Sequence, residues 1–281
     1  MSARMSLDST IAFIGAGNMA GALIRGLVST ATIAPDRVIA ADPDAERLGT
    51  LSSALGIRTT EVNTDALAGA DIVVLATKPQ TFRGLLPEIK DAVPSDALVV
   101  SIAAGVSTAI LEHGLGEATR VIRSMPNTPA LVGVGATAIA GGTHATEADL
   151  ELAERLFESV GLVVRVPEEQ LDAVTALSGS GPAYIFAMIE ALRDAAVKEG
   201  MSEEVALELT AQTVRGAARL LIDGGESPEA LRERVTSPGG TTRAGLDALE
   251  AADFSGAVAG AIRAATRRSA ELRQIAEAVD E

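Results

Sequence analysis

The residues that could carry chemistry in this sequence are mostly glycines, hydroxyl groups and backbone amides. The chain has no cysteine, which excludes disulfides, zinc–thiolate sites and thiol nucleophiles. Its two histidines, His113 and His144, lie far apart and are flanked by Gly and Thr, as in surface turns. We therefore expect no metal site, and the chemistry must use glycine-rich turns, hydroxyls and helix ends.

A glycine-rich turn near the N-terminus has the spacing of a dinucleotide-binding loop. It follows the apolar run Ile11–Ile14 and opens a helix. Its G-x-G-x-x-A pattern comprises Gly15, Ala16, Gly17, Asn18, Met19 and Ala20. Gly15 permits the tight turn, Gly17 lets a pyrophosphate approach backbone amides, and Ala20 lets the helix pack closely against the strand. The pattern alone is weak, but its position at the start of a βαβ unit predicts a bound dinucleotide.

The end of the second expected strand carries Asp42, which bears on the choice of cofactor. An acidic side chain at this point typically accepts hydrogen bonds from the adenosine ribose hydroxyls and repels a 2′-phosphate. The alternative is that Asp42, Pro43 and Asp44 simply form the cap and first turn of the next helix. Both interpretations can hold together, so the sequence favours NADH only slightly over NADPH.

Two further strand ends belong to the same edge of the expected sheet, where parallel strands line the ligand crevice. Their small residues and free backbone groups suit a flat nicotinamide or a ribose. They are Ala76, Thr77 and Lys78 after one strand, and Ile102, Ala103 and Ala104 after the next. Lys78 either pairs with a phosphate or is a solvated loop lysine. Asn63 either touches the ribose or caps a short helix, and the sequence favours the cap.

A second candidate site lies in the segment Val235–Thr242, which reads VTSPGGTT and precedes a helical stretch over Arg243–Glu250. Two glycines ahead of a helix start expose several N–H groups that can bind a small anion such as a carboxylate. The hydroxyls of Ser237, Thr241 and Thr242 would add donors. An ordinary Ser or Thr helix cap explains the same residues equally well.

The first half of the chain reads as the sheet that would bring these segments together. Short runs rich in Val and Ile alternate with helical segments, which predicts a parallel sheet covered on both faces. Strands are expected at residues 10–14, 37–41, 71–76, 97–103, 119–122, 135–140 and 161–166. Helices are expected at residues 18–29, 44–55, 81–92, 107–113 and 147–159. We predict an α/β fold with a Rossmann-like, doubly wound, mostly parallel domain over residues 1–167.

After residue 167 the pattern changes to long Ala- and Leu-rich helical stretches with no convincing strand. They are broken at Gly179–Pro182, Gly200, Gly224–Gly225 and Ser237–Gly240. We expect a C-terminal all-α domain over residues 168–281. Because this domain has few bulky residues from which to build its own core, it is a natural dimerisation element.

Composition limits the partners of the chain. Its formal net charge of −15 repels nucleic-acid phosphate and anionic lipid, so we expect neither nucleic acid nor a membrane as a partner. The N-terminal MSARMSLDST lacks the apolar core of a signal peptide. The longest apolar run, Ala183–Ile189, is far short of the ~20 residues that span a bilayer. We expect a cytoplasmic protein that acts on a small molecule.

Four sequence blocks resemble the pyrroline-5-carboxylate reductases, in the order of that family and across nearly the whole chain. They are FIGAGNM at Phe13–Met19, RSMPNTP at Arg123–Pro129, DAVTALSGSGPAYIF at Asp172–Phe186 and VTSPGGTTRAGL at Val235–Leu246. The segments TKPQ at Thr77–Gln80 and SIAAGV at Ser101–Val106 are similar to the family as well. The resemblance implies a Rossmann-like domain and a helical domain that forms an intertwined homodimer, often assembled further into decamers.

The resemblance also implies a reaction. NADPH or NADH would donate a hydride from nicotinamide C4 to C5 of the C=N bond of Δ1-pyrroline-5-carboxylate, giving proline. The substrate carboxylate would be held by Ser237 and the amides of Gly240, Thr241 and Thr242. The Thr242 hydroxyl would orient the ring nitrogen, while the proton comes from solvent. The cofactor would touch Asn63, Ala76, Lys78 and the Ile102–Ala104 segment.

The resemblance further places Glu168 near the substrate. Asp42 departs from the small polar residues that many NADPH-using members carry, which leaves the cofactor preference open. Two other readings compete. A β-hydroxyacid dehydrogenase would need a catalytic lysine that Gly179–Asp194 does not contain. A non-catalytic dinucleotide sensor would bind nucleotide without turnover, and damage to the Ser237–Thr242 segment would support it, but the segment is intact.

Overall fold

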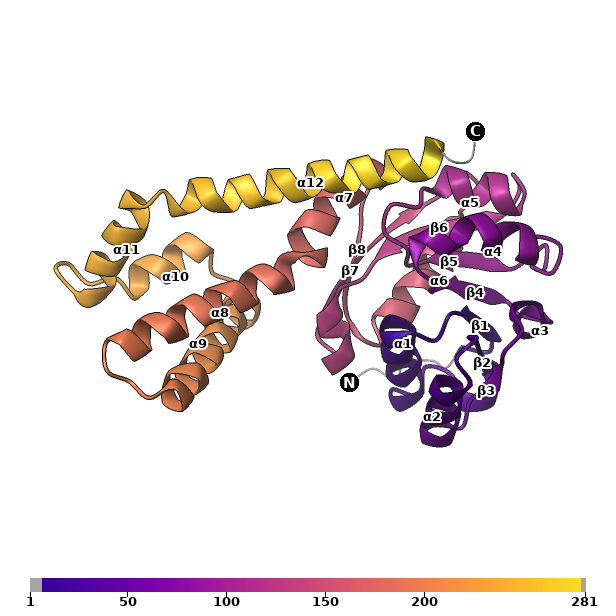
Figure 1. Cartoon of the computed structure of the whole chain (residues 1–281), viewed down its shortest axis with the longest axis horizontal. Helices are drawn as coiled ribbons and strands as arrows, with labels where there is room; N and C mark the ends of the chain where they lie inside the picture. The colour runs from indigo at the N-terminus through magenta and orange to yellow at the C-terminus, as the bar shows by residue number, and fades with distance from the viewer. Residues whose placement is uncertain (1–6, 279–281) are drawn as a thin grey trace. The chain divides into compact units, whose positions relative to one another are not determined.

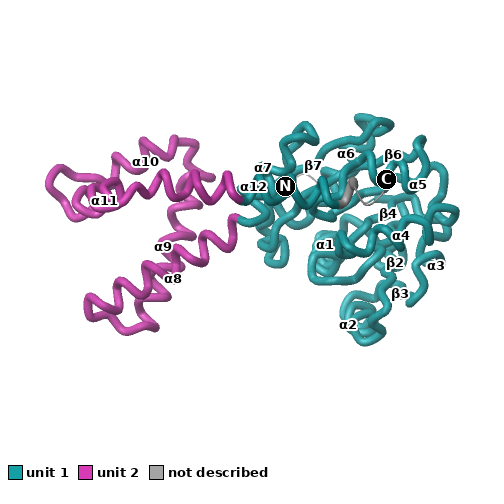
Figure 2. The backbone as a smooth tube through the Cα atoms, turned by 45° about the horizontal axis from the view of Figure 1, so that its top comes forward, with its two compact units in different colours: residues 1–180, 265–281 teal, residues 181–264 magenta. Residues whose placement is uncertain are grey.

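The structure is a computed structural model that describes residues 7–278. The chain packs as two compact units, which we call unit 1 (residues 1–180 and 265–281) and unit 2 (residues 181–264) (Figure 2). This division differs from the expected boundary at residue 167. The residues just after 167 pack against the sheet, since Leu171 is buried beside Ala138 and Ala140. The end of the last helix also belongs to unit 1.

Unit 1 is built on one eight-stranded sheet with the order β3-β2-β1-β4-β5-β6-β7-β8 (Figure 1). The strands are β1 Ile11–Ile14, β2 Val38–Ala41, β3 Arg58–Thr60, β4 Ile72–Leu75, β5 Leu98–Ser101, β6 Arg120–Met125, β7 Gly135–Gly141 and β8 Gly161–Arg165. Neighbouring strands are parallel except for β6 and β7, which run antiparallel. The predicted doubly wound, mostly parallel α/β fold is confirmed.

Helices cover both faces of this sheet (Figure 1). The covering helices are α1 Asn18–Ser29, α2 Ala45–Leu55 and α6 Glu147–Phe157 on one face, and α3 Asn63–Leu67, α4 Phe82–Ile89 and α5 Thr108–Leu115 on the other. Alternate residues of a strand point to opposite faces of the sheet. Phe13 of β1 therefore packs in the core under α1, whereas Ile14 packs in the core on the opposite face, which α3, α4 and α5 cover. Both faces are buried, which explains why the strands are continuously apolar.

The chain then passes through three short segments into unit 2. They are η4 Glu168–Gln170, α7 Leu171–Val174 and a π-helical turn η5 Thr175–Gly179. The long helices follow: α8 Gly181–Lys198, α9 Glu203–Gly224, α10 Pro228–Arg234, α11 Thr241–Ala251 and α12 Phe254–Ala278. The breaks from α8 to α11 fall where the sequence predicted, and Gly200, Gly225 and Gly239 have positive φ. The break between α11 and α12, where Asp253 has φ +53°, was not predicted.

Unit 2 has almost no core of its own in the single chain. α8 packs along α9, yet Ala206 is the one apolar residue of residues 181–264 that is buried. Large apolar side chains stay exposed instead, including Phe186 at 61% and Ile222 at 79%. This agrees with the expectation that the helical part has too few bulky residues to stand alone. Within residues 7–278 no helix has both the length and the apolar character that crossing a membrane requires.

Candidate active site

The carboxyl ends of four neighbouring strands lie level at one edge of the sheet in unit 1. β1 is in register with β2 and β4, and β4 with β5. The residues that follow these strands are Gly15, Asp42, Ala76 and Ile102. The N–H of Gly15 donates to the last carbonyl of β2 at 2.8 Å, and the N–H of Ala76 to the last carbonyl of β1 at 2.8 Å. The predicted cofactor segments of unit 1 therefore begin along one edge.

The turn between β1 and α1 requires glycine at its first position. Gly15 has φ +96°, and a Cβ placed there would lie 2.9 Å from the carbonyl carbon and oxygen of Ala76. Gly17 is the N-cap of α1, and an added Cβ there would meet nothing within 4 Å. Asn18 is exposed, whereas Ala20 is buried against the strand. The turn thus opens the N-terminus of a twelve-residue helix toward free space.

The carboxylate of Asp42 is buried and fully engaged within this edge. One oxygen accepts the N–H of Ala16 at 2.8 Å, and the other accepts the N–H of Asp44 at 3.0 Å. Arg47 forms an ion pair with Asp42 at 3.0 Å and with Asp44 at 3.1 Å. The capping alternative for Asp42 is wrong in detail, because Asp44 is the N-cap of α2 and accepts the N–H of Arg47. Asp42 instead ties the glycine turn to the end of β2.

The segments after β4 and β5 present small residues, as predicted. Ala76 and Thr77 are half-buried, and Lys78 is exposed at the start of the 3₁₀ turn η2 Pro79–Thr81. The Thr77 hydroxyl oxygen is a buried polar side-chain atom that has no hydrogen-bond partner among the described residues. A Cβ at Gly15 would lie 3.0 Å from the Thr77 methyl group, so this hydroxyl belongs to a side chain beside the glycine turn.

Asn63 does not cap a helix, contrary to the interpretation that the sequence favoured. It is the first residue of α3, whose N-cap is Val62, and its amide donates to Glu88 at 3.0 Å. On the other side of the edge, Ala103 is buried and its N–H donates to the Ser101 hydroxyl at 3.3 Å. Asn63 thus stands on a partly exposed surface, whereas the segment after β5 is fixed by its own hydrogen bonds.

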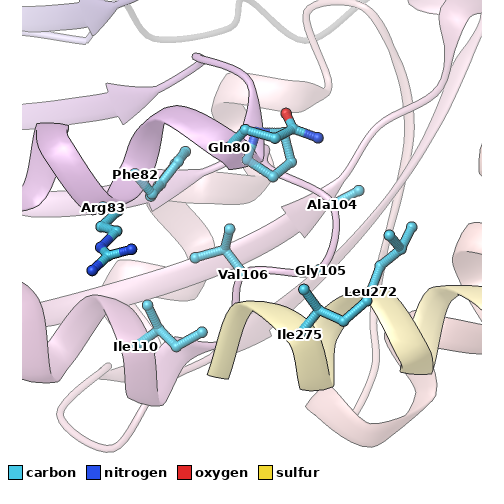
Figure 3. A pocket seen from close by; sticks show the side chains of 10 residues that line it. Gln80, Phe82, Arg83, Ala104, Gly105, Val106, Ile110, Leu272 and Ile275 are labelled. Carbon is cyan, nitrogen blue, oxygen red and sulfur yellow. The ribbon is translucent and has the colours of Figure 1, made fainter. Parts of the chain in front are cut away.

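A cavity of about 400 Å³ adjoins the segments after β4 and β5 within unit 1 (Figure 3). Its walls are mostly apolar side chains, with the Gln80 amide and the Arg83 guanidinium as polar groups. The lining residues are Pro79, Gln80, Phe82, Arg83, Ala104, Gly105, Val106, Ile110, Leu272 and Ile275. The last two come from the end of α12, which packs close to Gly105. The edge of the sheet therefore borders a sizeable apolar space.

The segment 235–242 of unit 2 ends in a helix N-terminus that no side chain of the described residues caps. Gly239 has φ +68°, and Gly240 is the N-cap of α11. Within the described chain no side chain caps this helix, so the Ser or Thr cap is not formed. The hydroxyls of Ser237 and Thr241 are on exposed residues, and Thr242 is half-buried. The first N–H groups of the eleven-residue helix have no partners within the helix and are available to an anion.

Glu168 is placed in unit 1, where its carboxylate contacts protein groups. It pairs with Arg123 of β6 at 3.1 Å and accepts two hydrogen bonds from Thr108, the first residue of α5. Arg123 and Asn127, both in the RSMPNTP block, were not singled out from the sequence. The signal that could have found Arg123 is a charged residue inside an otherwise apolar strand, because a buried charge needs a partner. Within residues 7–278 no cluster of acidic or histidine side chains could hold a metal ion.

A doubly wound sheet with a glycine turn at its carboxyl edge, followed by a helical unit, defines a class of dinucleotide-dependent oxidoreductases. Two family profiles match the chain. Residues 10–105 match "NADP oxidoreductase coenzyme F420-dependent", and residues 168–272 match "Pyrroline-5-carboxylate reductase dimerisation". A pyrroline-5-carboxylate reductase of Methanosarcina acetivorans is 46% identical over 94% of this chain and 98% of its own length.

Two solved structures are similar throughout. A pyrroline-5-carboxylate reductase of Coxiella burnetii has a TM-score of 0.90 at 40% identity, covering 95% of this chain and 99% of that one. A pyrroline carboxylate reductase of Plasmodium falciparum, solved with NADP bound, has a TM-score of 0.86 at 30% identity, covering 96% of this chain and 100% of that one. The chain belongs to the pyrroline-5-carboxylate reductase family, as the sequence blocks indicated. It is an NAD(P)H-dependent oxidoreductase that reduces the C=N bond of Δ1-pyrroline-5-carboxylate to give proline.

Proposed function

We propose that the glycine-turn edge of unit 1 and the segment 237–242 of unit 2 have separate binding roles in this reduction. The edge of unit 1 would bind the nicotinamide dinucleotide, which supplies the hydride when bound. The segment 237–242 of unit 2 would bind the substrate carboxylate. The observation that carries the proposal is the pair of open helix N-termini, one at Gly17 and one at Gly240, neither capped by a side chain. We propose residues 168–281 as the substrate-binding and dimerisation domain.

The residues present at the edge of unit 1 fit a dinucleotide. The space beside Gly17 lets a pyrophosphate approach the amides of Asn18 and Met19. The unpartnered Thr77 hydroxyl lies beside the same turn, where a polar ligand would complete its hydrogen bonding. The segments after β4 and β5 supply small residues for the nicotinamide ribose. These proposed contacts are Asn63, Ala76, Thr77, Lys78, Ile102, Ala103 and Ala104.

NADH is the cofactor that the charges around Asp42 favour. One guanidinium, Arg47, is shared between the carboxylates of Asp42 and Asp44, so the group carries one net negative charge. A 2′-phosphate of NADPH would add negative charge beside this group and be repelled, whereas the ribose hydroxyls of NADH carry no charge. Both Asp42 oxygens already accept hydrogen bonds within the protein, so the preference rests on charge. Asp42→Asn keeps an acceptor for the Ala16 amide and removes the charge. We expect the NADH-to-NADPH ratio of kcat/KM to fall about tenfold, equivalent to about 1.4 kcal/mol.

The matched control for this experiment is Asp44→Asn, because asparagine caps a helix as well as aspartate does. It removes the same charge from the half-exposed neighbour. If both variants changed the cofactor ratio equally, general surface charge would explain the effect and the role given to Asp42 would be wrong.

The substrate carboxylate would accept hydrogen bonds from the Ser237 hydroxyl and from the amides of Thr241 and Thr242. The Gly240 amide, which the sequence also assigned to the carboxylate, donates instead to the Ser237 carbonyl at 3.0 Å. A protonated imine is already electrophilic, so positioning of the ring accounts for most of the catalysis. We propose that the Thr242 hydroxyl accepts or donates one hydrogen bond at the ring nitrogen and orients it. Because a threonine hydroxyl is too weak an acid to be the proton source, the proton would come from solvent.

Thr242 is tested by comparing Thr242→Ala with Thr242→Ser. We expect the alanine variant to lose about tenfold to a hundredfold in kcat/KM for pyrroline-5-carboxylate, and the serine variant to retain most of it. The dissociation constant for NADH, measured without substrate, should stay unchanged in both. An alanine variant with unchanged kcat/KM would remove Thr242 from the mechanism.

The place of Glu168 near the substrate stays a prediction. Both oxygens of its carboxylate already accept hydrogen bonds, from Thr108 and Arg123. This engagement favours a role in positioning over direct contact with the substrate.

Self-association through unit 2 would cover the apolar side chains that the single chain leaves exposed. We propose a homodimer formed by residues 181–264, in line with the dimerisation profile matched by this region. Light scattering during size-exclusion chromatography tests it: Ile222→Glu should shift the mass toward the monomer, whereas Val62→Glu in unit 1 should not. The decamer remains an expectation from the sequence, and the mass of the wild-type protein in solution tests it. The cytoplasmic location also remains an expectation from the sequence.

The activity itself is tested by following the absorbance of reduced nicotinamide with purified protein, pyrroline-5-carboxylate, and NADH or NADPH. Substrate-dependent oxidation is the expected result, faster with NADH. Protein that bound the nucleotide without oxidising it would contradict this function and favour a dinucleotide sensor.

A further inference from the structure

Glu168 and Arg123 form an ion pair inside unit 1 that the reaction described above does not use. The Arg123 side chain is only 4% exposed, and its guanidinium lies 3.1 Å from Glu168 Oε1. A guanidinium that is so deeply buried must keep a negative partner, because removing one member of a buried pair leaves a charge uncompensated. Arg123 comes from the central part of β6, so the pair fixes Glu168 against the sheet.

The same carboxylate caps the first turn of α5. The Thr108 N–H donates to Glu168 Oε1 at 2.8 Å, and the Thr108 hydroxyl donates to Oε2 at 2.5 Å. Thr108 is the first residue of α5, so its N–H has no partner within the helix. The hydroxyl of the N-cap residue, Ser107, accepts the N–H of Ile110 at 3.4 Å. A carboxylate sixty positions along the chain therefore completes this helix start, and its charge suits the helix N-terminus.

The start of α5 follows a loop whose first three residues, Ile102–Ala104, we assign to the cofactor. Ile102–Val106 connects β5 to α5. Its first residues are held by the Ile102 N–H, which donates to Leu75 at 3.1 Å, and by the Ala103 N–H, which donates to the Ser101 hydroxyl at 3.3 Å. Gly105 lies within it at φ +77°, and glycine restrains the backbone less than other residues do, so contacts at the two ends matter for the path of the segment. The far end is held by the contact between Thr108 and Glu168.

We propose that Glu168, paired with Arg123, is a positioning residue for the loop Ile102–Val106, which carries the cofactor residues Ile102–Ala104. It acts through Thr108 on the backbone that faces the dinucleotide and does not touch the substrate. This inference rests on the proposed cofactor role of Ile102–Ala104. It assigns to Glu168 and Arg123 a function in cofactor affinity.

The variant Glu168→Gln tests the proposal, with Glu169→Gln as the matched control. Glutamine keeps the shape of the side chain and one acceptor for Thr108, but it leaves Arg123 without a counter-charge. Glu169 is the adjacent acid and is exposed. We expect Glu168→Gln to weaken NADH binding, measured by fluorescence titration without substrate, about tenfold, equivalent to about 1.4 kcal/mol. The KM for pyrroline-5-carboxylate at saturating NADH should change by less than about twofold, and Glu169→Gln should match the wild type.

Thr108→Val provides a test that leaves the ion pair intact. Valine has the shape of threonine but lacks the hydroxyl that donates to Glu168. NADH binding should weaken about threefold, roughly half of the free-energy effect of Glu168→Gln. A double variant, Glu168→Gln with Thr108→Val, should bind NADH about as weakly as the worse single variant if the two residues act as one unit.

Three results would overturn the proposal. A raised substrate KM with an unchanged NADH dissociation constant would place Glu168 at the substrate. Reduced thermal stability in Glu168→Gln, with NADH binding and both KM values unchanged, would show a purely structural pair. If Glu168→Gln did not fold, unchanged NADH binding in Thr108→Val would refute the proposal by itself. A wild-type protein with no substrate-dependent oxidation of NADH or NADPH would instead contradict the proposed function, whatever the variants did.

Discussion

Asn127 joins three parts of unit 1 through one buried amide, and its removal should destabilise the protein measurably. The residue is 9% exposed. Its side-chain oxygen accepts the N–H of Ala136 in β7 at 2.8 Å, and its side-chain nitrogen donates to the carbonyl of Ser178 at 3.1 Å. Ser178 lies in the π-helical turn η5 that precedes α8. One side chain therefore connects the segment after β6 to a strand and to the start of the helical region.

The size of the effect follows from the two backbone groups that Asn127→Ala leaves without these partners. An orphaned buried donor or acceptor costs roughly 1–3 kcal/mol. Ala136 and Ser178 are half-buried, so water reaches them in part and the lower end of the range applies. We expect the free energy of unfolding to fall by about 2 kcal/mol, and the Tm by roughly 4–8 °C for a unit of this size.

A second variant separates the two hydrogen bonds. Asn127→Asp keeps an acceptor for the Ala136 N–H, but at neutral pH its carboxylate has no hydrogen to donate and lies against the Ser178 carbonyl. We expect it to be at least as destabilising as Asn127→Ala at neutral pH. The difference from wild type should narrow in acid, where the protonated carboxyl group can donate to that carbonyl.

Urea unfolding followed by circular dichroism measures both effects, and a thermal melt at neutral and acid pH measures the second. Asn63→Ala is the control, because its amide makes an exposed hydrogen bond to Glu88, and it should change stability by less than about 0.5 kcal/mol. If Asn127→Ala unfolded with a free energy equal to that of this control, the two buried hydrogen bonds would contribute nothing and the reasoning would be wrong.

Three further predictions follow from single positions. Gly15→Ala should lower the free energy of unfolding by about 1–3 kcal/mol and weaken NADH binding in a fluorescence titration. The new Cβ would lie 2.9 Å from the Ala76 carbonyl, in a backbone with φ +96°. An alanine variant that binds NADH like the wild type would contradict this prediction. Gly240→Ala should raise the KM for pyrroline-5-carboxylate while leaving NADH binding unchanged, since its Cβ would fall 2.4 Å from a serine Oγ of the same segment; equal loss of both would indicate misfolding. Arg165 lowers the pKa of Glu154 through a side-chain hydrogen bond, so this contact stabilises the fold above the ordinary Glu pKa of 4.5 and the stabilisation is lost as the pH falls. The Tm difference between wild type and Arg165→Met should therefore shrink in acid. A Tm difference that does not change with pH would show that this ion pair does not contribute pH-dependent stability.

The sequence predicted the central strands well because β1, β2, β4 and β5 are buried on both faces and so read as apolar runs. β3 was missed, since Arg58, Thr59 and Thr60 form a short and partly exposed strand with no apolar signal. The antiparallel pairing of β6 with β7 was also not predicted. A connection that contains the short turn η3 Thr128–Val132 joins these strands, and the apolar runs alone do not reveal strand direction.

The candidate site was predicted wherever backbone conformation determines the residue type. The turn itself needs glycine at Gly15, which has φ +96°, so this position is visible in the sequence. Contacts between distant side chains leave no such pattern. Neither the pairing of Glu168 with Arg123 nor the tie between Asp42 and the Ala16 amide could be read from spacing, because each depends on how the sheet brings separate segments together. For the same reason the sequence put the cap of α2 on the wrong aspartate and gave Asn63 a cap that it does not form.

The return of the chain to unit 1 at residue 265 has a consequence for synthesis on the ribosome. The buried hydroxyl of Ser269 donates to Asp172 at 2.8 Å, across ninety-seven positions of sequence. Leu272 also forms part of the cavity wall beside the segment after β5. These contacts can form only after residues 265–275 have emerged, and hence after all of unit 2 has been made. A nascent chain that already contains the whole glycine turn and sheet therefore still lacks part of unit 1, and the folding of that unit must wait for residues 265–275.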